Sequence, residues 1–141
     1  EPQVSSTVGK ILRTSGFLIK SEYDQRMRIG GMLESIQGMG VKLESHGISQ
    51  VSMNLSNPDK TDIHVAYEAV RALAEPLGAK VNGSEIVGLV PLQSMLNAGR
   101  WYCGEDASEE VLVERAIHGL GLSTLEKFEP ESRIIEWALR A

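Results

Sequence analysis

Three groups of polar residues in this chain have the types and spacing that ligand binding or catalysis requires. Ser52 and Asn54 are separated by one residue in a stretch that alternates apolar and polar residues, so both side chains share one face of a predicted strand. Short hydroxyl and amide groups on a rigid strand can orient a ligand, but the same pattern is typical of a sheet face exposed to water. Both interpretations stay open for this pair.

Glu85, with Ser84 beside it, is a carboxylate inside the otherwise apolar stretch 83–91. Burying an ionised carboxylate is costly unless it is paired or hydrogen-bonded, so a glutamate in a core strand requires a reason. Either it bonds to backbone at a strand edge, or it accepts N–H groups of a ligand. The third group is Thr61–His64, at the start of a predicted helix, where Asp62 is more typical of a helix-dipole partner than of a base.

Other reactive chemistry is not supported. The three histidines (His46, His64 and His118) and the single Cys103 are dispersed and lack ligand spacing, so we predict no bound metal. The balance of 19 acidic against 14 basic residues, net −5, argues against a nucleic-acid partner. No apolar run approaches the roughly 18 residues of a membrane span, so no membrane partner is expected. The lone cysteine suits a reducing cytoplasm, which is the predicted location.

The elements that must position these residues follow from the apolar periodicity. In the first half we predict a helix over Val4–Leu12, a short strand or apolar tether at Phe17–Ile19, and a loop at Ser21–Gly31. Leu33–Glu44 and Ile48–Leu55 are predicted to pair as an antiparallel hairpin, because a turn signal separates two alternating segments.

The second half is predicted to be mainly helical around one strand. The periodicity predicts a helix over Ile63–Leu77 with a distorted last turn at its proline, and a buried strand over Lys80–Val90. Helices are predicted at Pro91–Arg100, Ser108–Gly119 and Pro130–Leu139.

These elements predict an α+β sandwich. The 141 residues are 42% apolar and 23% charged, which suits a single domain over residues 1–141. The element order is most of a ferredoxin-like split βαβ unit without its first strand. We therefore predict one mixed or antiparallel sheet with helices on one face, plus a helical C-terminal tail. The other face carries Gln50, Ser52 and Asn54, so it is either solvated or covered by a partner with a polar interface.

Two long motifs carry a resemblance to a known family. Gln50–Leu55, followed by Lys60-Thr61 and a helix, and then Gly83–Leu92 resemble glutamate formiminotransferase, and the segments 119–122 and 128–136 resemble the end of its domain. The resemblance covers residues 33–139 well and 1–32 weakly. It implies the C-terminal subdomain only of a transferase unit, in which two ferredoxin-like subdomains face each other across a polar, folate-binding channel.

The implied reaction transfers a formimino group from N-formimino-L-glutamate to tetrahydrofolate, its co-substrate, in histidine degradation and one-carbon metabolism. The family's catalytic histidine belongs to the first subdomain, so the resemblance assigns no catalytic residue to this chain. It implies a channel wall that faces folate or substrate, made of Ser52, Asn54, Ser84, Glu85 and Gly88. The implied partner is the N-terminal subdomain, or a second copy in a homodimer joined through the polar sheet face.

Two alternatives to a transferase half stay open. The chain can be a non-catalytic protein that binds folate or another small ligand. It can also be an assembly module that pairs sheet to sheet and has lost its ligand. We expect this chain alone to be inactive as a transferase, because the family's catalytic histidine belongs to the other subdomain.

Overall fold

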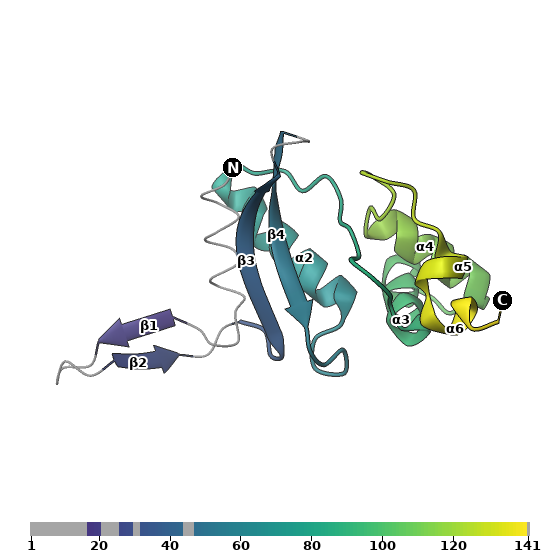
Figure 1. Ribbon diagram of the computed structural model, residues 1–141, viewed down its shortest axis with the longest axis horizontal. Helices are drawn as coiled ribbons and strands as arrows, with labels where there is room; N and C mark the ends of the chain where they lie inside the picture. The colour runs from purple at the N-terminus through teal and green to yellow at the C-terminus, as the bar shows by residue number, and fades with distance from the viewer. Residues whose placement is uncertain (1–16, 21–25, 30–31, 44–46, 141) are drawn as a thin grey trace. The chain divides into compact units, whose positions relative to one another are not determined.

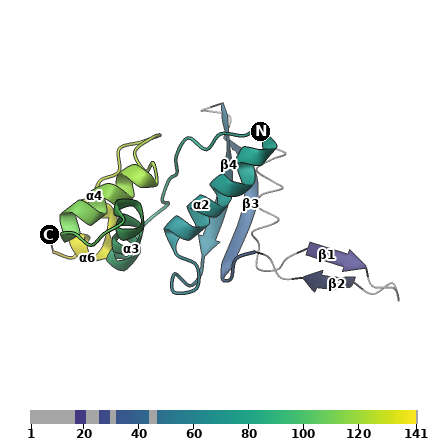
Figure 2. The same cartoon turned by 180° about the vertical axis from the view of Figure 1, so that it is seen from behind.

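The computed structural model of the chain describes residues 17–20, 26–29, 32–43 and 47–140, which form two compact units. The first unit holds the described residues up to Thr61 together with Glu68–Val81, and the second holds Asp62–Tyr67 and the described residues from Asn82 onward. Strands belong to the first unit and most helices to the second, which confirms the α+β class (Figures 1 and 2). The helix predicted at Val4–Leu12 lies outside the described residues, and the single-domain organisation stays a prediction.

The first described elements are two short paired strands. β1 (Phe17–Lys20) runs antiparallel to β2 (Arg26–Ile29), with Phe17 opposite Ile29. The predicted loop over Ser21–Gly31 is therefore wrong for its second half. The sequence Arg-Met-Arg-Ile alternates polar and apolar residues with the period of a strand, but a run of four residues is too short to stand out from its polar surroundings.

β3 (Ile36–Leu43) and β4 (Ile48–Leu55) form the predicted antiparallel hairpin. The register pairs Gly38 with Met53 and Met39 with Ser52, so the two hairpin faces differ in composition. One face combines the glycines of β3 with the apolar residues of β4. The opposite face carries the polar residues of β4.

α2 (Ile63–Ala74) covers the face of the hairpin that carries Met53 (Figures 1 and 2). Its buried residues Ala69 and Val70 pack against partly buried apolar side chains, namely Leu33, Val51, Met53, Leu73 and Val81. The helix ends in a short 3-10 turn, η2 (Glu75–Leu77), and Gly78 closes it with a left-handed φ of 82°. The distorted last turn predicted from Pro76 is confirmed, since proline lacks the N–H that continues an α-helix.

In the second unit, α3 (Leu92–Cys103) packs closely on α4 (Glu109–Gly119). The contact is built from small and apolar residues, and Ala98 and Ala116 are both 0% exposed. Ser108 caps α4, because its hydroxyl accepts a hydrogen bond from the N–H of Val111 at 3.4 Å. Both helices were predicted from the sequence.

The C-terminal segment forms two short helices, α5 (Pro130–Arg133) and α6 (Ile135–Ala138), so the single helix predicted over Pro130–Leu139 is wrong. Ile134 separates them with an extended backbone (φ −87°, ψ 120°) and a fully buried side chain. At this point the chain leaves the helix to form a parallel bridge with Val90.

Glu109 ties the start of α4 to the C-terminal segment. One oxygen of its carboxylate accepts hydrogen bonds from Trp137 Nε1 at 2.6 Å and from Arg140 Nη2 at 2.7 Å. The two hydrogen bonds, that from Trp137 first, lower the pKa of Glu109 because they favour the charged carboxylate.

The strand predicted over Lys80–Val90 is also wrong in the described residues. Only Val90 forms a bridge, and Gly88 bends the chain with a φ of 82°. A strand requires a ladder of backbone partners, but here the carbonyls of Ile86 and Gly88 accept hydrogen bonds from the Arg133 side chain instead. The expectation of a buried Glu85 fails with the strand, since Glu85 is exposed.

Candidate functional site

The residues predicted to face a ligand fall into two groups. Ser52 and Asn54 lie on β4 in the first unit, whereas Ser84, Glu85 and Gly88 lie on the extended segment 82–90 in the second unit. Each group therefore has its own local environment.

Ser52 and Asn54 lie on the face of the hairpin that α2 does not cover. Both are exposed, whereas Val51 and Met53 between and beside them are partly buried against the helix. The predicted alternation of β4 is therefore confirmed for residues 52–55, whereas residues 48–51, Gln50 among them, are all partly buried. Their cross-strand neighbours are Met39 opposite Ser52 and Gln37 opposite Asn54. This face thus offers hydroxyl and amide groups beside a methionine that is 60% exposed.

A hydrogen-bond network fixes the end of the hairpin next to Asn54. The Ser35 carbonyl accepts hydrogen bonds from the backbone N–H of Ser56 at 2.9 Å and from its hydroxyl at 3.0 Å. The Thr61 hydroxyl, 2% exposed as a residue, donates to the Glu34 carbonyl at 2.7 Å. Thr61 therefore stabilises the strand ends, which holds the polar face in a fixed geometry.

Asp62 and His64, the other polar residues at the start of α2, have structural contacts in the second unit. The Asp62 carboxylate, 8% exposed as a residue, accepts hydrogen bonds from the Ile63 N–H at 2.8 Å and from Asn97 Nδ2 at 2.9 Å. The His64 ring lies 6.0 Å from the Trp101 ring. Asp62 is thereby a buried carboxylate with hydrogen-bond partners, as its position at a helix start predicts.

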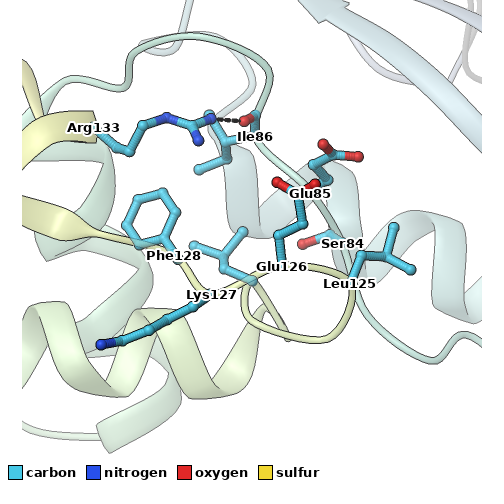
Figure 3. Close-up of a pocket in the computed structure, with 9 residues that line it drawn as sticks. Ser84, Glu85, Ile86, Leu125, Glu126, Lys127, Phe128 and Arg133 are labelled. Carbon is cyan, nitrogen blue, oxygen red and sulfur yellow. Dashed lines mark hydrogen bonds between the residues drawn. The ribbon is translucent and has the colours of Figure 1, made fainter.

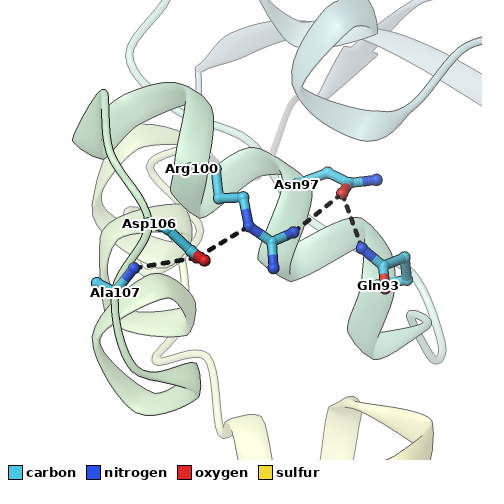
Figure 4. Close-up of polar contacts among 5 residues, drawn as sticks. All are labelled: Gln93, Asn97, Arg100, Asp106 and Ala107. Carbon is cyan, nitrogen blue, oxygen red and sulfur yellow. Dashed lines mark hydrogen bonds and ion pairs between the residues drawn. The ribbon is translucent and has the colours of Figure 1, made fainter.

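Asn97 belongs to a polar row along α3 (Figure 4). Its Oδ1 accepts hydrogen bonds from Gln93 Nε2 at 2.8 Å and from Arg100 Nη1 at 3.5 Å. Arg100 in turn forms an ion pair with Asp106 at 3.1 Å. These groups satisfy one another on an exposed helix surface, so the row needs no ligand to explain it.

In the second unit, Ser84 is held against the end of α4. Its hydroxyl donates to the Leu120 carbonyl at 2.5 Å, and its N–H donates to the Gly121 carbonyl at 3.2 Å. Gly83 allows this approach, because a Cβ there would lie 2.7 Å from the Gly121 carbonyl oxygen. Ser84 anchors the segment, and its neighbour Glu85 is exposed to solvent.

Glu85 is one of the residues that line a hollow (Figure 3). Besides Ser84 and Glu85, the lining residues are Ile86, Leu122, Leu125, Glu126, Lys127, Phe128 and Arg133. Glu85 and Glu126 are both exposed, and Figure 3 shows that the Lys127 side chain extends away from Glu85. The hollow can therefore present carboxylate acceptors beside an aromatic ring.

Arg133 also lines the hollow and contacts the extended segment 82–90. Its Nε donates to the Gly88 carbonyl at 2.7 Å, its Nη2 donates to the Ile86 carbonyl, and its guanidinium lies 5.7 Å from the centre of the Phe128 ring. The sequence places Arg133 only within the resembling segment 128–136 and assigns it no role. No local pattern indicates that its side chain bonds to residues more than 40 positions away.

The described residues lack two kinds of feature. Among residues 17–20, 26–29, 32–43 and 47–140, no three or more His, Cys, Asp and Glu side chains gather where they can hold a metal ion. In the same part of the chain, no helix has both the length and the apolar character needed to cross a membrane.

Fold and site together define a small protein of the α+β class with an exposed polar strand face. A sequence model of the formiminotransferase domain family matches residues 3–140, so the chain belongs to this family. The formimidoyltransferase-cyclodeaminase of Rattus norvegicus is 40% identical over 111 residues, which cover 76% of this chain and 20% of that protein.

Two relatives named glutamate formimidoyltransferase match over shorter regions. The glutamate formimidoyltransferase of Thermoplasma acidophilum is 37% identical over 92 residues, 64% of this chain and 30% of that protein. That of Streptococcus pyogenes is 34% identical over 73 residues, 52% of this chain and 24% of that protein. The matched regions thus span 20–30% of these three relatives.

Proposed function

We propose that this chain is the folate-binding half of a glutamate formiminotransferase, equivalent to the C-terminal subdomain of the transferase unit. The observation that carries the proposal is the family match over residues 3–140, which includes both motifs of the proposed channel wall. The exposed polar face of β4 and the exposed Glu85 support it, because both leave polar groups available to a ligand.

The proposed reaction transfers a formimino group between two nitrogen atoms. The amine of tetrahydrofolate attacks the formimino carbon of N-formimino-L-glutamate, and a new carbon–nitrogen bond forms. The bond from that carbon to the glutamate nitrogen breaks, and a proton moves from the folate amine to the glutamate amine. A base in the partner subdomain moves this proton, while this chain holds and orients the substrates.

The proposed wall residues have distinct tasks. Ser52 and Asn54 supply hydroxyl and amide groups, which can donate to and accept from a pterin or an amidine. Glu85 supplies a carboxylate that accepts N–H groups of the ligand. We further propose a ferredoxin-like fold for the complete subdomain, a cytoplasmic location, and a polar face covered by the N-terminal subdomain or by a second copy of this chain.

Calorimetric titration with 5-formyltetrahydrofolate and with tetrahydrofolate tests this proposal. The double variant Ser52→Ala/Asn54→Ala should bind about tenfold or more weakly, since each lost hydrogen bond is worth about 0.5–1.5 kcal/mol. Its melting temperature should stay near that of the unchanged chain, because both side chains are exposed. Ser49→Ala is the matched control, because Ser49 lies on the opposite face of the same strand.

Two outcomes would contradict the proposal. If the unchanged chain gives no binding heat at millimolar folate, the assembly module is favoured over any folate-binding protein. If the double variant unfolds at a much lower temperature, the two residues are structural and the binding loss has another cause.

An activity assay separates a transferase half from a non-catalytic binding protein. The chain alone is expected to give no turnover with N-formimino-L-glutamate and tetrahydrofolate, and adding a separately produced N-terminal subdomain of the family should restore it. Turnover by the chain alone would show that this chain itself contains the base, against the proposal. Binding without restored turnover would favour the non-catalytic protein.

A further inference from the structure

We infer that Arg133 is a positioning residue, which holds the segment Ile86–Val90 so that Glu85 is presented to the ligand. The inference rests on the proposed function, because it assigns a role to a residue that supports the proposed wall. Arg133 does not touch the ligand in this arrangement. It acts through the backbone of the segment that carries Glu85.

One residue makes three hydrogen bonds to this segment. The Arg133 carbonyl accepts from the Val90 N–H at 2.9 Å, Nε donates to the Gly88 carbonyl at 2.7 Å, and Nη2 donates to the Ile86 carbonyl. Among the described residues, no ladder of backbone hydrogen bonds holds the chain between Ile86 and Gly88. The guanidinium therefore donates hydrogen bonds to carbonyls that a neighbouring strand would bind in a sheet.

The fork of an arginine suits this task only because the segment bends. Carbonyls two residues apart in a regular strand are separated by about 6.6 Å, twice the rise per residue, which is more than a guanidinium spans easily. Gly88 adopts a φ of 82°, and this bend brings its carbonyl and that of Ile86 to one guanidinium. A planar group with donors in a fixed fork then binds both carbonyls at once.

The same contacts set the direction of the neighbouring side chains. The guanidinium lies over Phe128 on one side of the segment, and the Glu85 carboxylate points away from it (Figure 3). Ser84 fixes the chain just before Glu85, and the Arg133 bonds fix it just after. Glu85 is thereby held at both ends, which limits the loss of conformational entropy on binding a ligand.

Substitution of Arg133 by methionine isolates the side chain, because the backbone bond to Val90 is kept. In Arg133→Met we expect the amides of Val90 and Ile135, which flank the contact, to exchange with deuterium about tenfold faster. The amide of Leu112, bonded to the Ser108 carbonyl in the helix pair, should exchange at an unchanged rate. Binding of 5-formyltetrahydrofolate should weaken by about tenfold. Arg115→Met, at an exposed arginine of α4, is the matched control.

Two further variants test the geometry. Arg133→Lys keeps the charge over Phe128 but cannot reach both carbonyls through a planar fork, so it should exchange and bind like Arg133→Met. Gly88→Ala strains the bend, and its effect on binding should be less than additive with that of Arg133→Met because both disrupt one contact.

The two measurements separate this inference from the function on which it rests. Unchanged exchange at Val90 and Ile135 in Arg133→Met overturns the positioning role, whatever the ligand does. Faster exchange with unweakened folate binding overturns it too, because the segment then does not serve the ligand. If the wild-type chain binds no folate, the proposed function and the role of Arg133 in ligand binding are overturned together, even where the amides exchange faster in Arg133→Met. Full rescue by Arg133→Lys refutes the fork geometry.

Discussion

Replacing Gly99 by alanine should destabilise the second unit strongly, although alanine is the better helix former. A Cβ at position 99 would lie 2.1 Å from the carbonyl oxygen of Leu112 and 2.8 Å from its Cα. These obstacles are backbone atoms of α4, so the helices must move apart to accept the methyl group. Overpacking of this kind costs up to about 3 kcal/mol, and the gain in helix propensity offsets about 1 kcal/mol.

The expected net loss is therefore about 2 kcal/mol, which lowers the melting temperature by about 8–16 °C in a unit of this size. Thermal unfolding followed by circular dichroism measures it. Gly119→Ala should cost less, because its Cβ would meet the Tyr102 ring at 2.4 Å, and a side chain can rotate away. Gly104→Ala should cost about 1 kcal/mol from its left-handed φ alone, since its surroundings are open. An unchanged melting temperature for Gly99→Ala would refute the close contact between α3 and α4.

Three further substitutions test the second unit. Glu109→Gln should lose the stability that the charged carboxylate gains from Trp137 and Arg140. That gain is present above the unfolded pKa and disappears as the pH falls through the lowered folded pKa. Between pH 7 and pH 3, the melting temperature of the variant should therefore fall less with decreasing pH than that of the wild-type chain. Glu136→Ala should lower the free energy of unfolding by about 0.5 kcal/mol, and the melting temperature slightly, because this carboxylate accepts a hydrogen bond from the first N–H of α3 at 2.7 Å. Ser84→Ala should cost about 1 kcal/mol in urea unfolding, because the hydroxyl bonds to a carbonyl at the end of α4; equal stability would contradict this contact.

The hairpin and α2 were predictable because their signals are local and strong. The period of two in Ile48–Leu55 predicts which residues share a face, and α2 then covers the apolar face. This periodicity alone is enough to place Ser52 and Asn54 together on the polar side of the strand. The pattern does not say whether a ligand, a partner or water meets them, because the same alternation serves all three.

The segment Lys80–Val90 was mispredicted because apolar composition does not supply a strand partner. Val87 and Leu89 are typical strand residues, yet they are 91% and 59% exposed. What decides the conformation is a side chain far along the sequence, Arg133, together with the bend at Gly88. The break at Ile134 has the same origin, since that residue leaves the helix to pair with Val90. Contacts of this kind join residues more than 40 positions apart and leave no periodic signal.

Neighbouring residues of one motif therefore need not share a role. Ser84 bonds to the end of α4, and Gly88 supplies a bend that other residues adopt only under strain. The hydrogen bond of Ser84 and the bend at Gly88 are both explained by the fold, without a ligand. Glu85 lies between them and is exposed, which leaves its carboxylate open to a ligand. If the motif binds folate, Glu85→Gln should weaken binding without a loss of stability. Ser84→Ala should lower the stability more than it weakens binding. Which of the two properties each substitution changes more separates a ligand-facing residue from its support.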